Sequence, residues 1–419
     1  MIDPILAPLE KEALQLDAAD PIATLRDAFA IPDGVTYLDG NSLGALPKSV
    51  PEHLDNVVRA QWGADLIRSW NTHQWIDLPQ LTARKLAPLL GVESHQVTVC
   101  DSISINLFKA LSIALAHQTE RSLVLSNTQN FPTDLYIAQG LEHLLGEQRC
   151  QLKTVDTHAI ESALSDEVAV LMLTQVDFRT GELLDIERLT RLAHEVGAVV
   201  IWDLAHSTGV IPLELNQWNV DIAVGCGYKY LNGGPGAPAF IALNEALLTA
   251  PNQPIWGWMG HAAPFAFNAD YEPAANSRQM LTGTPGILSL AALNAALDVF
   301  NGVDMYAVRE KSVRLSSLFI QGVALLDSHL EGVTLPYSFE PEQRGSHVAL
   351  RHPDAYAVTQ ALIARHVIID FRAPDLMRFG FAPLYNRYYD VVIALDALLS
   401  IITSKTYQHP EYHQRATVT

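Results

Sequence analysis

Lys229 has the surroundings of a lysine that does chemistry. It follows the apolar run DIAVGC, residues 221–226, and precedes the glycine-rich run NGGPG, residues 232–236. A lysine is costly to bury while it is charged, and burial lowers its pKa, so a neutral amine becomes available to form a Schiff base with a carbonyl group. The alternative is a strand-end lysine whose ammonium group reaches solvent, and Lys229 alone does not separate the two.

Asp203 favours the catalytic interpretation. It ends a second apolar run, AVVIWD, at the place where α/β folds bind ligands. A carboxylate there can keep the pyridine nitrogen of pyridoxal phosphate (PLP) protonated, and the protonated ring stabilises a carbanion next to the imine. His206 could stack on such a ring, donate a hydrogen bond or fill space. Asp203 alone could be a helix cap, but Asp203, His206 and Lys229 together predict a PLP site.

Two segments could hold the phosphate and the ring of such a cofactor. DSISINLFKALSIAL, residues 101–115, is a polar loop that runs into a helix, whose free N–H groups and positive dipole end suit an anion. Hydroxyl-rich helix starts are also ordinary caps. Phe131, beside Pro132, could lie against a planar ring or belong to the core.

Arg378 is the candidate to bind a substrate carboxylate, because its planar guanidinium makes two parallel hydrogen bonds to one. Arg372 and Arg387 are nearby competitors, and spacing does not choose among them. No metal site is expected.

Short apolar runs alternate with amphipathic stretches between about residues 95 and 245. DIERLTRLAHEVG, residues 185–197, has helical spacing, an acid in its first turn and a closing glycine. Alternation of helix and strand predicts a parallel sheet. The predicted strands are residues 122–127, 168–176, 198–203 and 221–226.

The chain of 419 residues is longer than one hydrophobic core usually organises, so two domains are expected. Residues 285–300 are nearly apolar all round and predict a buried helix, starting at or near Pro285, that links the two domains. Beyond it, HVALRH and HVIIDFR are short strand candidates. The predicted fold class is α/β, with a mostly parallel central sheet in a large domain, residues 60–300, and a smaller α+β domain made of residues 1–59 and 301–419.

Composition excludes several classes of protein. A formal net charge of -19 argues against a nucleic-acid partner, which clustered Lys and Arg would have to bind. The three cysteines, Cys100, Cys150 and Cys226, form neither a disulfide framework nor a C-x-x-C pair. The amino terminus lacks a secretory signal, and no run of eighteen apolar residues predicts a membrane span. A cytoplasmic enzyme is expected.

Six motifs follow one another along nearly the whole chain. They are YLDGNSLGALPK at 37–48, NFPTD at 130–134, DLAHSTG at 203–209, GYKYLNGGPG at 227–236, GWMGH at 257–261 and LYNRYYD at 384–390. The box around YKYLN and the early GNSLG are more specific than a general PLP-lysine signature. Together the six motifs resemble the kynureninase family, and its bacterial members most.

This resemblance implies a fold-type-I PLP enzyme, like aspartate aminotransferase, of the class V aminotransferase family. Its members hydrolyse L-kynurenine, and in some cases 3-hydroxy-L-kynurenine, to anthranilate and L-alanine through a ketimine intermediate in tryptophan catabolism. A homodimer with a shared active site is implied.

The family motifs also imply residue roles. Lys229 would be the Schiff-base lysine, Asp203 would face the pyridine nitrogen, and Tyr228 would bind phosphate and act as a proton donor whose phenol is acidified by the phosphate and lysine network. Trp258 and Thr284 would reach the phosphate of the second subunit. The remaining implied cofactor contacts are Ile103, Ser104, Phe131, Pro132, Thr133, Asp134, Thr174 and His206, and the implied substrate contacts are Arg378 and Asn41.

One departure concerns substrate preference. Family members that favour 3-hydroxykynurenine have a histidine where Trp70 stands in this chain, and an asparagine where Thr284 stands. Both differences favour unhydroxylated kynurenine, with Trp70 as a substrate contact.

Other functions remain to be weighed. A cysteine desulfurase needs a catalytic cysteine late in the chain, whereas the last one here is Cys226. An epimerase, another lyase or an aminotransferase could use the same carbanion, and a non-catalytic relative would bind no PLP. No G-x-G-x-x-G follows an early strand, so a nicotinamide dehydrogenase is poorly supported.

Overall fold

The computed structural model describes residues 2–248 and 253–415. These residues form two compact units. The small unit comprises Met1–Lys48, Phe178–Leu183 and Val299–Thr419, and the large unit comprises Ser49–Asp177 and Leu184–Asp298.

The large unit contains a seven-stranded sheet with the order β2-β8-β7-β6-β5-β3-β4. The five strands from β7 to β4 are parallel, and β8 is antiparallel to both of its neighbours. The predicted strands and the mostly parallel sheet are therefore confirmed. The strands are β2 (Val97–Val99), β3 (Leu123–Asn127), β4 (Gln151–Val155), β5 (Val168–Thr174), β6 (Val199–Asp203), β7 (Ile222–Cys226) and β8 (Ala239–Leu243).

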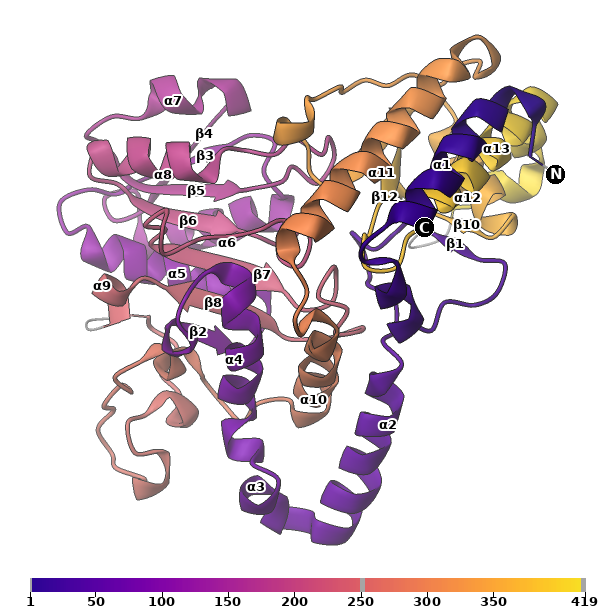
Figure 1. Ribbon diagram of the computed structural model, residues 1–419. Coiled ribbons are helices and arrows are strands. Elements are labelled where there is room, and N and C mark those ends of the chain that lie inside the picture. The colour runs from indigo at the N-terminus through magenta and orange to yellow at the C-terminus, as the bar shows by residue number, and fades with distance from the viewer. Residues whose placement is uncertain (1, 249–252, 416–419) are drawn as a thin grey trace. The chain divides into compact units, whose positions relative to one another are not determined.

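Helices cover both faces of this sheet (Figure 1). Ile201 belongs to the apolar cluster that includes α5, whereas the next residue, Trp202, donates from its indole to Thr190 of α8. Because adjacent strand residues point to opposite faces, α5 and α8 lie on opposite sides. The helices described here are α2 (Ser49–Asn56), α3 (Ser69–Thr72), α4 (Leu78–Leu90), α5 (Ile103–His117), α6 (Pro132–Leu145), α7 (Ile160–Ala163), α8 (Ile186–Glu195), α9 (Glu245–Leu248) and α10 (Ile287–Ala296), with a π-helix at Val57–Asp65.

Two helix predictions can be compared with these bounds. The helix expected at 185–197 is α8, capped by Asp185, whose carboxylate accepts from the N–H of Arg188. The helix expected to start near Pro285 begins two residues later, at Ile287, and continues after Ala296 as a 3-10 turn.

The small unit packs helices against two small sheets. β9 (His347–Arg351), β11 (Asp370–Arg372) and β12 (Leu376–Gly380) form an antiparallel sheet in the order β11-β12-β9, while β1 (Thr36–Tyr37) pairs with β10 (Val367–Ile368). The candidate HVIIDFR is thus two strands of different sheets, and the chain changes sheet at Ile369. The helices are α1 (Ala7–Ala19), α11 (Met305–Leu325), α12 (Ala355–Ala364) and α13 (Tyr388–Ser404).

Among the described residues, no single helix has the length and apolar composition to cross a membrane. One bent pair, Ile287–Phe300 with Met305–Leu325, passes that test jointly, by length and composition only.

Candidate active site

The carboxyl ends of the parallel strands bring the predicted catalytic residues of the large unit together. Lys229 lies in the turn three residues after β7, and its Nζ is 3.0 Å from Nε2 of His206, which follows β6. Lys229 is half-buried. A lysine amine held by an imidazole at this edge is placed to react with a carbonyl group.

A pair of buried carboxyl groups lies beside this lysine. Asp203 ends β6 and Asp134 lies in the first turn of α6, and both side chains are almost fully buried and hydrogen-bonded to each other. Burial and then the charge of Asp203 raise the pKa of Asp134 well above its usual range. Burial also raises the pKa of Asp203, although the charge of Lys229 lowers it. Two like charges in one buried site repel each other, so ionisation of both acids together is unfavourable.

The site also contains a residue that sequence reasoning missed. Asn130 accepts hydrogen bonds from the hydroxyl of Thr174, at 2.5 Å, and from the N–H of Phe131, at 2.7 Å. Its amide donates to Ser126. Thr174 also lies 3.3 Å from Asp134 Oδ2. Asn130 therefore fixes both the threonine at the end of β5 and the aromatic residue at the start of α6.

The predicted phosphate and ring contacts have the geometry that they would need. Ser102 caps α5, and the N–H groups of Ile103 and Ser104 have no acceptor among the described residues. Phe131 is 40% exposed, and Pro132 and Thr133 follow it in the first turn of α6. Free N–H groups at a helix start, an exposed aromatic ring, a buried carboxylate and a lysine together fit PLP.

Tyr228 lies directly before Lys229. Nζ of Lys229 lies 6.0 Å from the centre of the phenol ring. In the chain itself, burial raises the pKa of its phenol above the ordinary value, and the nearby Cys226 and Asp203 raise it further. Tyr228 is therefore protonated near neutral pH. The predicted acidification depends on the cofactor phosphate and stays a prediction.

Trp258 and Thr284 are both solvent-exposed in the single chain. Trp258 belongs to an exposed aromatic cluster with Phe265 and Phe267. The N–H of Met259 donates to the carbonyl of Thr282, so the segments that carry Trp258 and Thr284 are tied together.

Trp70, the predicted specificity residue, is half-buried in α3. Its ring makes an edge contact with Trp75, with 5.9 Å between ring centres. The indole N–H of Trp75 donates to Gln61, which holds this segment in place.

In the small unit, Arg378 is buried within β12 and is already paired. Its Nε donates to Asp370 Oδ1 at 2.7 Å and its Nη2 donates to Asp370 Oδ2, while Nη1 donates to the carbonyl of Phe178. Nη2 also lies 3.2 Å from Ser42 Oγ. The Nε edge of the guanidinium is thus occupied by Asp370, and only Nη1 retains an N–H without a described acceptor.

The loop before Ser42 adds two further polar groups. Asn41 is fully buried, and neither its side-chain oxygen nor its nitrogen has a partner among the described residues. It lies against Gly380, where a Cβ would come within 1.7 Å of Asn41 Oδ1, so only glycine fits there. Burial and the charge of Asp370 raise the pKa of Asp39 to about 7.

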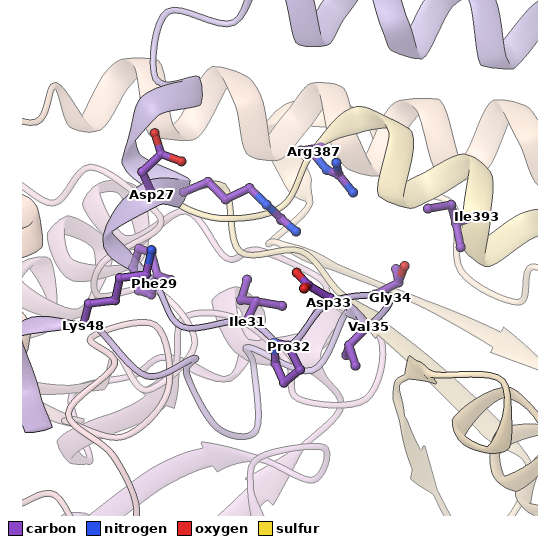
Figure 2. A pocket seen from close by; sticks show the side chains of 12 residues that line it. Asp27, Phe29, Ile31, Pro32, Asp33, Gly34, Val35, Lys48, Arg387 and Ile393 are labelled. Carbon is purple, nitrogen blue, oxygen red and sulfur yellow. The ribbon is translucent and has the colours of Figure 1, made fainter.

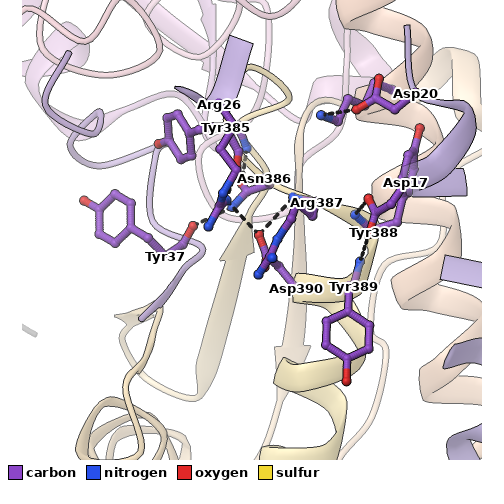
Figure 3. Close-up of polar contacts among 12 residues, drawn as sticks. Asp17, Asp20, Arg26, Tyr37, Tyr385, Asn386, Arg387, Tyr388, Tyr389 and Asp390 are labelled. Atoms are coloured by element: carbon purple, nitrogen blue, oxygen red, sulfur yellow. Dashed lines mark hydrogen bonds and ion pairs between the residues drawn. The ribbon is translucent and has the colours of Figure 1, made fainter. Parts of the chain in front are cut away.

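The motif LYNRYYD has a structural role (Figure 3). Asp17 of α1 accepts from the N–H groups of Tyr388 and Tyr389 at the start of α13, and Asp390 pairs with both Arg26 and Arg387. The motif therefore ties the amino-terminal segment to α13. Arg387, which was an alternative to Arg378 as the candidate that binds a substrate carboxylate, pairs with Asp390 instead.

A hollow of about 390 Å³ adjoins that network (Figure 2). Ile393 of α13 and Arg387, the residue before that helix, line it together with the loop that includes Asp33. Its charged lining contains both signs, with Lys48 among the bases and Asp27 among the acids. Since its arginines are already paired with Asp390, it favours no class of ligand.

Comparisons with known proteins decide the family. The model of the kynureninase C-terminal domain matches residues 308–398. A kynureninase of Burkholderia mallei is 46% identical over 416 residues, covering 98% of this chain and 99% of that protein. The kynureninase of Pseudomonas fluorescens is 46% identical over 413 residues, covering 97% and 99%.

The chain belongs to the kynureninase family.

Solved structures confirm the expected fold class. A cysteine desulfurase from Thermococcus onnurineus has a TM-score of 0.77 at 17% identity and covers 91% of this chain and 98% of its own. The desulfurase CsdA from Escherichia coli has a TM-score of 0.73 at 20% identity, covering 91% and 99%. At these identities the likeness concerns the fold alone, and kynureninase membership comes from the sequence relatives.

Proposed function

We propose that this chain hydrolyses L-kynurenine to anthranilate and L-alanine with PLP as its cofactor. Near-full-length identity to kynureninases supports the activity. The observation that carries the proposal is the hydrogen bond between Lys229 and His206 beside the buried Asp203–Asp134 pair.

Lys229 is the residue that would hold the cofactor through its amine, and the same amine would take the α-proton of the substrate. When bound, PLP supplies a protonated pyridine ring that accepts the electron pair released at the α-carbon. Asp203 keeps the ring nitrogen protonated through the single negative charge of the carboxyl pair. Asp134, the partner that retains its proton, orients that carboxylate.

Tyr228 donates a proton to the β-carbon. Its raised pKa keeps the phenol protonated until the step that needs it. Water adds to the γ-ketone, and cleavage of the carbon–carbon bond releases anthranilate, so that the proton from Tyr228 completes the methyl group of alanine.

Arg378 and Asn41 bind the substrate. The remaining N–H of Arg378 Nη1 and the unpartnered amide of Asn41 are donors for an anionic or carbonyl oxygen. Asp370 fixes the orientation of the guanidinium, which lowers the entropy cost of this contact.

The active enzyme is a cytoplasmic homodimer in which Trp258 and Thr284 of one subunit reach the phosphate held by the other. Their exposure in the single chain supports this arrangement. Trp70 and Thr284 favour kynurenine over its 3-hydroxy form.

The activity is tested with purified protein, PLP and L-kynurenine, following the visible absorbance of the bound cofactor and the release of anthranilate. We expect Lys229→Ala to abolish both signals, and Lys153→Ala, an exposed lysine on β4, to change neither. If the protein binds PLP and turns yellow but does not cleave kynurenine, the proposed substrate is wrong. If the protein stays colourless with PLP, the proposed cofactor is wrong.

Tyr228→Phe tests the proton donor. We expect kcat to fall by about 10²-fold or more while the cofactor absorbance remains, because a general acid contributes roughly that factor. Tyr306→Phe, a change at an exposed tyrosine of α11, is the matched control. Unchanged turnover in Tyr228→Phe would remove this role.

A further inference from the structure

A buried ion pair lies next to the helix start that would hold the phosphate. Lys109 of α5 is fully buried, and its Nζ donates to Asp101 Oδ2 and to the carbonyl of Met280, both at 2.5 Å. Helix side chains lean toward the helix N-terminus, so a lysine in the second turn can reach back to the residue before the cap. Burying a lysine is costly, and a lysine kept in this position calls for an explanation.

Asp101 places a negative charge in the turn before α5, and Lys109 neutralises it. Asp101 immediately precedes the cap Ser102, and its backbone has a left-handed conformation, with φ of 50°. Asp101 therefore precedes Ile103 and Ser104, the residues with free N–H groups, by two and three positions in the same turn. An unpaired negative charge there would repel a phosphate, whereas a carboxylate neutralised by Lys109 leaves the positive end of the helix dipole available.

The second acceptor of Lys109 connects this turn to another segment of the large unit. The carbonyl of Met280 also lies 3.7 Å from Cys100 Sγ, and Thr98 donates to Ser277 at 2.9 Å. Thr284 follows four residues after Met280. Lys109 thus joins the turn before α5 to the segment that leads to Thr284.

We propose that Lys109 is a positioning residue for the cofactor phosphate, which neutralises Asp101 and holds it beside the start of α5. The inference rests on the proposed function, because it assumes that the phosphate of PLP binds there. It concerns selectivity for the phosphate: the ion pair determines how much more tightly the chain binds PLP than pyridoxal, which lacks the phosphate.

The test compares dissociation constants of PLP and pyridoxal for the full chain stripped of cofactor, by fluorescence titration. In Lys109→Met we expect PLP to weaken at least about tenfold more than pyridoxal, because the unpaired carboxylate acts on the phosphate alone. In the double variant Lys109→Met with Asp101→Asn, the ratio of the two constants returns toward that of the wild type. Equal weakening of both ligands, or no recovery in the double variant, would overturn the proposal.

Asp101→Asn alone decides the matter if Lys109→Met does not fold, since Lys109 then keeps its bond to Met280. We expect the preference for PLP over pyridoxal to stay the same or increase, and a decrease would count against the proposal. The matched control is Lys311→Met, which breaks the buried pair of Lys311 with Asp20, 2.7 Å apart, in the small unit. It should reduce stability and leave the ratio unchanged.

Failure of this inference can be told apart from failure of the proposed function. If the wild-type chain forms no absorbing complex with PLP, the proposed function fails. If the wild type binds PLP, but the ratio of the PLP and pyridoxal dissociation constants does not change when the ion pair is broken, only the proposed role of Lys109 is wrong.

Discussion

Each unit of the molecule contains a pair of neighbouring acids, and the pKa values of the two pairs are shifted in different ways. In the large unit, Asp134 and Asp203 bond to each other, and burial raises the pKa of both. In the small unit, burial would raise the pKa of Asp370, but its hydrogen bonds and the charges of Arg378 and Arg372 bring it below the usual value, while the pKa of Asp39 rises to about 7.

The difference lies in the cations available to each pair. The charge of Lys229 lowers the pKa of both large-unit acids, but burial outweighs it, so ionisation of both acids together is unfavourable. Two arginines neutralise Asp370, so its carboxylate is fully ionised and serves to orient Arg378. Asp39 is then the surplus acid of its cluster. Asp203 is thus suited to pair with a positively charged ring, whereas Asp370 fixes the orientation of the Arg378 guanidinium.

The largest effect on turnover should come from replacing the two acids of the large unit one at a time. Asp203→Asn removes the charge that keeps the ring protonated, and we expect kcat to fall by about 10²–10³-fold, the cost of losing a preorganised electrostatic contact. Asp134→Asn replaces a protonated acid with a neutral amide of the same shape, and we expect it to remain within about tenfold of the wild type, since one neutral hydrogen bond can be replaced by another. Steady-state kinetics measure both.

Bound cofactor is the control for these variants. The absorbance of each should show full occupancy before the rates are compared. Equal losses in the two variants would mean that the two carboxyl groups are interchangeable, and the assignment of the charge to Asp203 would be wrong.

A smaller effect on catalysis should follow from removing the charge that orients Arg378. Asp370→Asn leaves Arg378 buried but removes one of two paired acceptors, so the guanidinium loses its fixed orientation. We expect KM for kynurenine to rise by about tenfold with a smaller change in kcat, because a misplaced anchor weakens substrate binding. Asp354→Asn, a change at the residue before α12, is a control. A fall in kcat with unchanged KM would contradict the proposed role.

Sequence patterns located the main elements of the site because strand ends are local features. Apolar runs that stop at Asp203 and Cys226 placed Asp203 and Lys229 at one edge of the sheet, and the structure brings them together with His206. Asp134 could not be identified from its own pattern, because an acid in the first turn of a helix is common.

Contacts that depend on register or on long-range packing escaped prediction. Asp370 pairs with Arg378 because the β11–β12 hairpin aligns them opposite each other, and turn geometry sets that register. Asn130 reads as an ordinary turn residue, and Lys109 as one polar residue in an apolar helix. Their roles depend on Thr174 and on Met280, which lie 44 and 171 positions away.

The smallest effect concerns stability and pH. The pKa of Asp39 is about 7 in the folded chain against 3.8 for the free residue, so the folded state binds the proton more tightly. Its contribution to stability is therefore complete below about pH 4 and is lost as pH rises to about 7, by a few kcal/mol at most. Asp370, whose pKa is lowered, behaves in the opposite way, since its contribution is present above about pH 4 and is lost in acid. Asp39→Asn should therefore flatten the decline of the denaturant midpoint between about pH 4 and 7. Asp370→Asn should flatten it less, because it removes the charge of Asp370 but leaves Asp39 buried. The same slope in the wild type and in Asp39→Asn would show that Asp39 is ionised throughout that range and that the arginines neutralise both acids.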